Sequence, residues 1–88
     1  MKIKSDFITR EVAGEVVVVP TGEAAATFQG MITLNPSAEF LWKHLQEENT
    51  EENLLKEMLE EFDVPEEIAR RDIRGFIGML WEQGILEE

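Results

Sequence analysis

Few residues of this chain have the type and spacing that catalysis or metal binding requires. His44 is the single histidine, and the chain has no cysteine to join it as a metal ligand. The carboxylates occur in polar runs such as Glu47-Glu48, not in an apolar segment that would raise a pKa. Ser5 and Ser37 have no base nearby, and no glycine-rich phosphate loop is present. The sequence therefore predicts no catalytic residue, no metal site and no cofactor.

A binding surface is the better candidate for function. The basic residues form one tight cluster, Arg70, Arg71 and Arg74, in a segment with helical periodicity. At 100° per residue, Arg70, Arg74 and Trp81 fall within roughly 40° of one another, beside Ile77. Two cations and an aromatic side chain suit contact with an amphipathic, partly acidic peptide. Salt bridges to neighbouring glutamates would also explain the arginines.

Composition restricts the class of partner. The chain has 88 residues and a formal net charge of −11, which repels phosphate backbones and argues against nucleic-acid binding. No apolar run approaches the ~18 residues that span a bilayer, and the N-terminus has no signal-peptide pattern. We therefore expect one cytoplasmic domain, residues 1–88, with no membrane partner.

The first part of the chain predicts a three-stranded antiparallel meander over residues 7–13, 16–19 and 27–34. Gly14-Glu15 fits a two-residue type II′ hairpin loop, and residues 23–26 fit either a mobile loop or one helical turn. The third strand has no partner on one side, so an extended peptide could pair with its free N–H and C=O groups, and Ile32 is expected to supply one such donor. The residues predicted to make this contact are Gln29, Gly30, Met31, Ile32 and Thr33.

The second part of the chain predicts three helices, over residues 36–45, 51–62 and from residue 65 to a stop at Gly84. The apolar face of the last helix includes Ile73 and Leu80. Asn35 is a suitable N-cap for the first helix. Gly75 and Gly78 lie inside the last helix, where we interpret them as tolerated on a solvated face, with room for a partner as the alternative. The expected fold is α+β: a three-stranded antiparallel sheet followed by three helices, similar to a winged helix-turn-helix.

The order of short motifs resembles a known family. A Phe-x-x-Arg-Glu-Val-x-Gly-Glu-Val-Val-Val-Val hairpin begins at Phe7. It is followed by Leu34-Asn35-Pro36-Ser37-Ala38 leading to Trp42, and by Asp72-Ile73-x-x-Phe76-Ile77-x-x-Leu80-x-x-x-Gly84-Ile85-Leu86. This ordered set covers the chain from Phe7 to Leu86 and resembles the PqqD-like family of peptide-recognition domains.

The resemblance implies a non-catalytic peptide chaperone. Members of that family bind the leader part of a ribosomally made precursor peptide and present it to a modifying enzyme, often a radical S-adenosylmethionine (radical SAM) enzyme. The leader is added as a strand beside the third strand, with its side chains toward the third helix. The chain departs from the family in its Ala-rich connection at residues 21–26 and its acidity, so a peptide pathway other than pyrroloquinoline quinone (PQQ) biosynthesis also fits.

Two other functions compete with the peptide adaptor. A winged-helix regulator would bind nucleic acid through the arginine cluster, against the charge of the whole chain. A structural subunit would pair its free strand with a second copy, as a homodimer.

Overall fold

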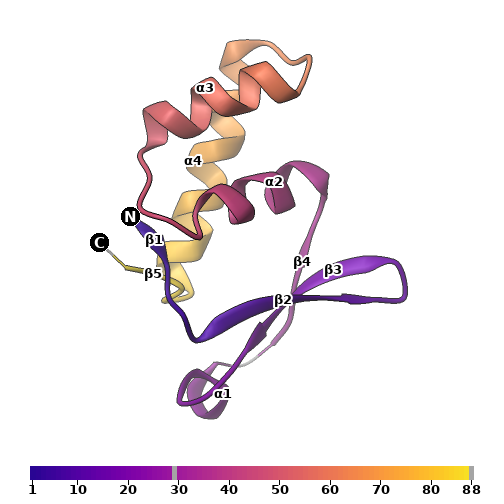
Figure 1. The fold of residues 1–88 in the computed structure, drawn as a ribbon, viewed down its shortest axis with the longest axis vertical. Coiled ribbons are helices and arrows are strands. Elements are labelled where there is room, and N and C mark those ends of the chain that lie inside the picture. Colours follow the sequence, from indigo (N-terminus) through magenta and orange to yellow (C-terminus); the bar gives the residue numbers. More distant parts are fainter. Residues whose placement is uncertain (29, 88) are drawn as a thin grey trace.

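The computed structural model describes residues 1–28 and 30–87. A three-stranded sheet lies at one end of the molecule, and the long helices lie at the other, with α4 passing behind α2 and α3 (Figure 1). This arrangement confirms the α+β fold; the winged helix-turn-helix likeness stays a prediction. The elements are β1 (Lys2–Ile3), β2 (Phe7–Val12), β3 (Glu15–Pro20), α1 (Ala24–Thr27), β4 (Ile32–Leu34), α2 (Pro36–His44), α3 (Glu51–Glu61), α4 (Glu66–Glu82) and β5 (Leu86–Glu87).

The sheet has the strand order β2-β3-β4, and both of its strand pairs are antiparallel. Alternate side chains point to opposite faces, so Phe7, Val18 and Leu34 share the face that packs into the core. The opposite face carries Ile8 and Val12, which are exposed. The predicted meander is confirmed in its order and direction.

The hairpin between β2 and β3 differs from the prediction by one residue. Its loop is Ala13-Gly14, with φ of +53° and +83°, and Val12 pairs with Glu15. Positive φ at both loop residues is typical of a type I′ turn, whereas a type II′ turn at Gly14-Glu15 was expected. The type I′ loop keeps the right-handed twist of the flanking strands, and that gain outweighs the strain at Ala13. This shift changes the pairing register of the hairpin.

The third strand of the sheet is shorter than expected. β4 covers only Ile32–Leu34, whereas residues 27–34 were predicted. Residues 24–27 form the single helical turn α1, which was one of the two alternatives for the Ala-rich connection. Gly30 has a φ of +99°, which an extended strand does not contain, so the chain bends before β4 begins.

The junction between β4 and α2 confirms the expected helix start. The Asn35 side-chain oxygen accepts a hydrogen bond from the Ala38 N–H at 2.8 Å and another from the Ser37 hydroxyl at 3.0 Å. Pro36 occupies the first turn of α2, where its missing N–H is not needed. Strand and helix are therefore joined without a loop, which fixes the angle between them.

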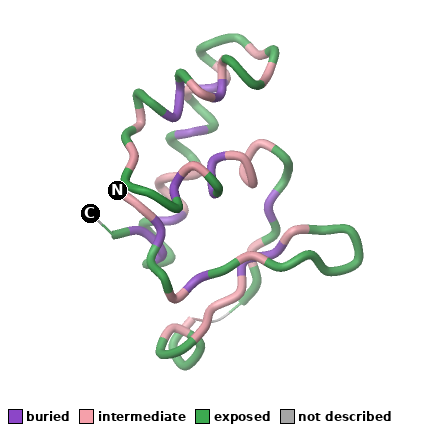
Figure 2. Tube along the Cα trace, viewed as in Figure 1, coloured by how far each residue is buried: buried purple, intermediate pink, exposed green. Residues whose placement is uncertain are grey.

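The core lies between the inner face of the sheet and the three long helices, as the buried positions in Figure 2 show. Its fully buried members include Leu45, Leu54, Ile73 and Leu80. α3 packs against α4, and α2 packs against both α3 and β4. None of the helices in the described part of the chain has the length and apolar character that crossing a bilayer requires.

The C-terminal end of α4 is fixed by its cap. Gly84 has a φ of +72°, and the Ile85 N–H donates to the Leu80 carbonyl at 2.9 Å, which is the pattern of a Schellman motif. The chain then continues into β5, which pairs with β1 in a two-stranded sheet that the sequence did not predict. This small sheet holds the end of α4 beside the start of the chain.

Candidate functional site

The free edge of the main sheet is the first component of the site. β4 pairs with β3 on one side, and no strand from residues 1–28 or 30–87 pairs with its other side. The N–H and C=O groups along that side are consequently available to another chain. This is the unpaired third-strand edge that the sequence predicts.

The register of the sheet determines which peptide groups face outward. Val12 and Glu15 close the hairpin and form a hydrogen-bonded pair, because the turn bond joins these two residues. Hydrogen-bonded and non-hydrogen-bonded pairs alternate along an antiparallel ladder. Val17 therefore forms a hydrogen-bonded pair with β2 and directs its peptide groups toward that strand. Val16 and Val18 direct their peptide groups toward β4. The pair Val17–Thr33 is therefore non-hydrogen-bonded on the β4 side. Thr33 presents its N–H and C=O to the free edge.

This register corrects the expected role of Ile32. Ile32 pairs with Val18, so its peptide groups face β3 and not the free edge. A hairpin loop at Gly14-Glu15, as expected from the sequence, would reverse which residues of β3 direct their peptide groups toward β4. With the same β3–β4 pairing, Ile32 would then face outward. The Ile32 side chain is half-buried against the core.

The remaining predicted edge residues lie near the start of β4. Gly30, Met31 and Thr33 are exposed, and Met31 has 73% of its surface accessible. Gln29 lies outside the described residues. Contact between a peptide and these residues stays a prediction. The left-handed backbone of Gly30 supplies a structural reason for glycine there, independent of any partner.

A cavity of about 280 Å³ lies at the C-terminal end of β4, between the start of α2 and the middle of α4. α2 and its cap contribute small side chains, including Ala38, and α4 contributes Arg71, Asp72, Gly75 and Phe76. A Cβ atom placed on Gly75 would meet no heavy atom within 4 Å. The absent side chain of Gly75 therefore leaves open space at this end of the edge.

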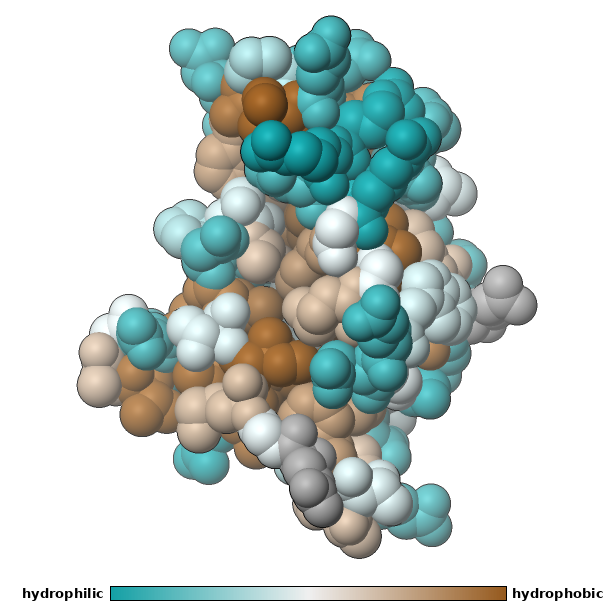
Figure 3. Space-filling view, turned by 180° about the vertical axis from the view of Figure 1, so that it is seen from behind, coloured by the Kyte–Doolittle hydropathy of each residue, from teal (hydrophilic) through white to brown (hydrophobic). Residues whose placement is uncertain are grey.

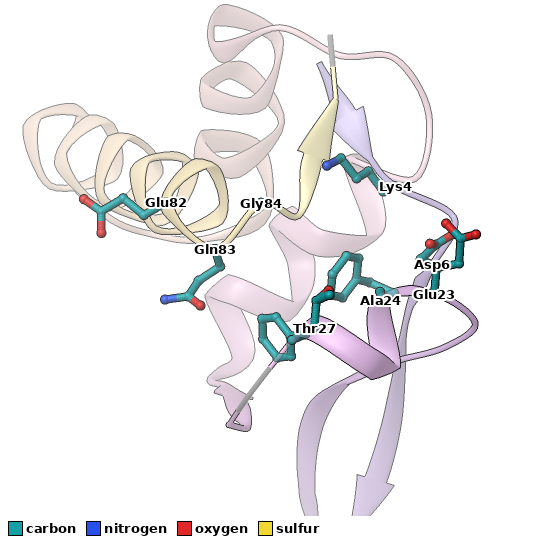
Figure 4. A pocket seen from close by; sticks show the side chains of 10 residues that line it. Lys4, Asp6, Glu23, Ala24, Thr27, Glu82, Gln83 and Gly84 are labelled. Carbon is teal, nitrogen blue, oxygen red and sulfur yellow. The ribbon is translucent and has the colours of Figure 1, made fainter.

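A second cavity, of about 480 Å³, lies at the opposite end of the same edge (Figure 4). Its walls are α1 with the following Phe28, the segment before β2, and the C-terminal end of α4 at Glu82, Gln83 and Gly84. Phe28 packs edge-on against Phe7, with ring centroids 5.3 Å apart, and this contact anchors the chain that leads to β4.

Together the two cavities show that α4 runs alongside the chain segment that contains β4, in the opposite direction. The middle of α4 faces Asn35, and the end of α4 faces Phe28. We call the surface between α4 and Phe28 together with residues 30–35 the β4–α4 trough. Phe76 and Met79, both half-buried, lie on the same flank of α4 as Asp72 and Gly75, between the two ends of the trough.

The predicted arginines lie on the other flank of α4, which faces α3. Arg74 Nε donates to Glu51 at 2.7 Å, and Arg70 contacts Glu66 at 2.9 Å and Glu52 at 3.5 Å. The hydrogen bond to Glu66 is the main factor that raises the pKa of Arg70 above its ordinary value. Within the described residues the structure thus brings Arg70 and Arg74 to carboxylates of α3 and α4, and not to the lining of either cavity. Arg71, the third arginine of the cluster, contacts Asp72 at 3.4 Å and lines the cavity beside Gly75.

The other two α4 residues predicted as site residues lie on the same flank of the helix as Arg70 and Arg74. Ile77 is half-buried against the core, and Trp81 has 42% of its surface exposed. Neither residue lines the two cavities of the trough. A peptide contact at Arg70, Arg74, Ile77 and Trp81 stays a sequence-based prediction, and the β4–α4 trough is a competing location for the peptide.

The trough residues Asp72, Gly75 and Phe76 were not predicted as site residues. The available signal was Gly75, because a glycine inside a helix lowers stability by about 1 kcal/mol relative to alanine. Periodicity defined the core face of α4, but it did not determine which flank of that face lies toward β4. His44 packs against Phe40, with ring centroids 4.4 Å apart, and no metal-binding cluster occurs among residues 1–28 and 30–87.

Hydrophobic and hydrophilic side chains are unevenly spread on the rear face of the molecule. Figure 3 shows hydrophobic groups gathered over its lower half, where the sheet lies, and hydrophilic groups over much of its upper half. The apolar surface thus coincides with the part of the molecule that carries the free edge.

Comparison with known proteins identifies the family. Residues 15–86 match the family described as "Coenzyme PQQ synthesis protein D (PqqD)". The chain belongs to the PqqD family. That match covers β3, β4 and the three long helices, so the whole trough lies within it. No curated protein matches the sequence.

Two solved structures share the fold of this PqqD-family chain. One is described as "TbiB1 in Complex with the TbiA(beta) Leader Peptide", with 23% identity, a TM-score of 0.76, and coverage of 99% of this chain and 95% of that one. The other is "Lasso peptide synthetase B1 complexed with the leader peptide", with 17% identity, a TM-score of 0.74, and coverage of 99% and 96%. At these identities the likeness concerns the fold.

Proposed function

We propose that this PqqD-family domain binds the leader of a ribosomally made precursor peptide and presents the peptide to a modifying enzyme. The observation that carries the proposal is the free N–H and C=O of Thr33, which point away from β3 on the unpaired edge of β4. An extended peptide in the trough would pair with Thr33 and extend the sheet by one strand. The peptide backbone would supply affinity, and its alternate side chains would supply specificity.

The shape of the trough favours β4 over the other free edge of the sheet. β2 is the opposite edge strand, and Thr9, which pairs with Val18, presents its peptide groups outward there by the same alternation. The β4 edge, however, has α4 alongside it and a cavity at each end. A peptide at β4 would bury side chains against a helix as well as form backbone bonds.

Family membership and the neighbouring structures support the proposal. Both neighbours are described as complexes with leader peptides. We propose that the domain has no catalytic role of its own and that its second partner is a peptide-modifying enzyme of the radical SAM class, in PQQ biosynthesis or a related pathway. A cytoplasmic location stays a prediction. Nucleic-acid binding is not favoured, because the net charge is −11 and the arginines Arg70 and Arg74 contact carboxylates.

Amide hydrogen exchange tests the strand-addition mechanism. Peptides selected on the immobilised protein from a random display library serve as probes. We expect the Thr33 amide to exchange quickly in the free protein and about tenfold or more slowly in the complex, because a bound strand accepts its hydrogen bond. The Ile32 amide, which faces β3, serves as the internal control and should change little.

Two results would contradict the proposal. One is a Thr33 amide that stays unprotected in every complex. The other is protection that grows with protein concentration in the absence of peptide, which would mean that a second copy occupies the edge and that the protein is a self-assembling homodimer.

The arginine flank gives a separate prediction. Arg74→Ala removes the contact with Glu51, which is an exposed salt bridge, so we expect the free energy of unfolding to fall by less than about 1 kcal/mol. We expect the affinity for a selected peptide to change less than about twofold, because Arg74 lies away from the trough. Urea unfolding and isothermal titration calorimetry measure the two quantities. A tenfold loss of affinity would instead place the peptide on the flank predicted from the sequence.

A further inference from the structure

The cavity beside α1 lies beyond the short strand that the peptide would extend. Ile32 follows Phe28 after three intervening residues, a path of about 13 Å or less at 3.3 Å per residue. A peptide paired with Thr33 therefore reaches this cavity within a few residues of its paired segment. The cavity volume, about 480 Å³, exceeds the about 280 Å³ at the other end of the trough.

The floor and rim of this cavity differ in chemistry. Phe28, with Phe7 packed edge-on against it, supplies an aromatic wall. Asp6 and Glu23 lie on one side of the opening, where the Thr21 N–H and hydroxyl both donate to the Asp6 carbonyl and hold the start of α1 close to Asp6. Figure 4 shows the two carboxylates near each other at that side.

Acidic side chains outnumber basic ones in the lining of the cavity. No ion pair within residues 1–28 and 30–87 involves Asp6 or Glu23. Lys4 is the single cation in the lining, and Figure 4 shows it on another part of the rim, while Glu82 extends away from the opening. The net charge of −11 adds a field that also favours a cation.

We propose that this cavity is a specificity pocket for a basic side chain, Lys or Arg, of the bound leader. The proposal rests on the proposed function and specifies the chemistry of its ligand. The methylene stem would pack on Phe28, and the cationic head would bind the carboxylates of Asp6 and Glu23. An apolar side chain would leave both carboxylates without a partner, and an acidic one would be repelled by them. A preference for basic side chains is the opposite of the preference for acidic ones that the arginine cluster suggested.

A double-mutant cycle with selected peptides tests the pocket. The probes are display-selected peptides whose binding requires the Thr33 N–H, meaning that they bind Thr9→Pro, on the other edge strand, but not Thr33→Pro. Each Lys or Arg of such a peptide is replaced by Gln, and its affinity is measured with the wild type and with Asp6→Asn/Glu23→Gln, which keeps the side-chain shapes. We expect one basic residue whose replacement weakens binding about tenfold with the wild type and less than about twofold with the double variant.

A matched variant distinguishes the effect of the pocket carboxylates on peptide affinity from the effect of the net charge. Glu47→Gln/Glu60→Gln also changes the net charge from −11 to −9, because each variant removes two carboxylates, but these exposed residues line neither cavity. It should retain the full tenfold effect. The pocket proposal fails if no basic residue couples to Asp6 and Glu23, or if the matched variant reduces the effect equally. If no selected peptide requires the Thr33 N–H, the proposed function fails, and the pocket fails with it.

Discussion

Thr33→Pro is expected to abolish detectable peptide binding while the domain stays folded. Proline removes the N–H on the unpaired edge of β4, and its ring occupies the path of an added strand. Loss of one backbone hydrogen bond together with this clash should weaken binding by at least about tenfold, or about 1.4 kcal/mol. The fold should tolerate the change, because proline is accepted in edge strands where the N–H faces solvent. Calorimetry with selected peptides and circular dichroism measure the two effects.

Two matched variants make the result specific. Thr33→Val keeps the N–H and should bind like the wild type. Thr9→Pro makes the same substitution at the outward-facing residue of the other edge strand, β2, and should also retain binding. If Thr9→Pro abolishes binding and Thr33→Pro does not, the peptide pairs with β2 and the assignment of the trough is wrong.

Gly75→Leu is expected to raise the stability of the domain and to block the peptide. A Cβ at this position meets no heavy atom within 4 Å, and leucine is the better helix former by about 0.5–1 kcal/mol. The melting temperature should therefore rise by about 3–5 °C. The leucine side chain would fill the cavity of about 280 Å³ beside Ala38, so we expect peptide affinity to fall by about tenfold or more.

Gly78→Leu provides the control for this prediction. Gly78 is also a helical glycine with open space around it, but it lines neither cavity of the trough. It should produce a similar gain in melting temperature, measured by calorimetry, without a loss of affinity. Equal affinity losses in both variants would indicate a general effect of α4 and would argue against a peptide at Gly75.

The sequence predicted those parts of the fold that depend on local chemistry. The Asn35 cap and the Gly84 stop were predicted from residue type, and both are present with the expected hydrogen bonds. Helical spacing identified the core positions of α4, including Ile73 and Leu80, because a buried face repeats every three to four residues. The motif order also indicated the PqqD family, which the match over residues 15–86 confirms.

The sequence predicted the site less completely, because a site depends on how elements face one another. A one-residue shift in the hairpin loop, from Gly14-Glu15 to Ala13-Gly14, transferred the outward-facing N–H from Ile32 to Thr33. Propensity could not predict that shift, since either pair of residues can form a two-residue turn. The bend at Gly30 likewise shortened the third strand, although the residue pattern there fits a longer one.

By itself, the sequence determined the order of the three main-sheet strands and the three long helices, and the buried face of the helices, because these follow from residue type and spacing along one segment. It did not predict the short strands β1 and β5, whose pairing joins the two ends of the chain. Tertiary structure alone decided which flank of α4 lies beside β4. Arg70 and Gly75 lie on opposite flanks of the same core stripe, and periodicity treats those flanks alike. The packing of α3 against the flank with Arg70 and Arg74 left the flank with Gly75 facing the free strand edge.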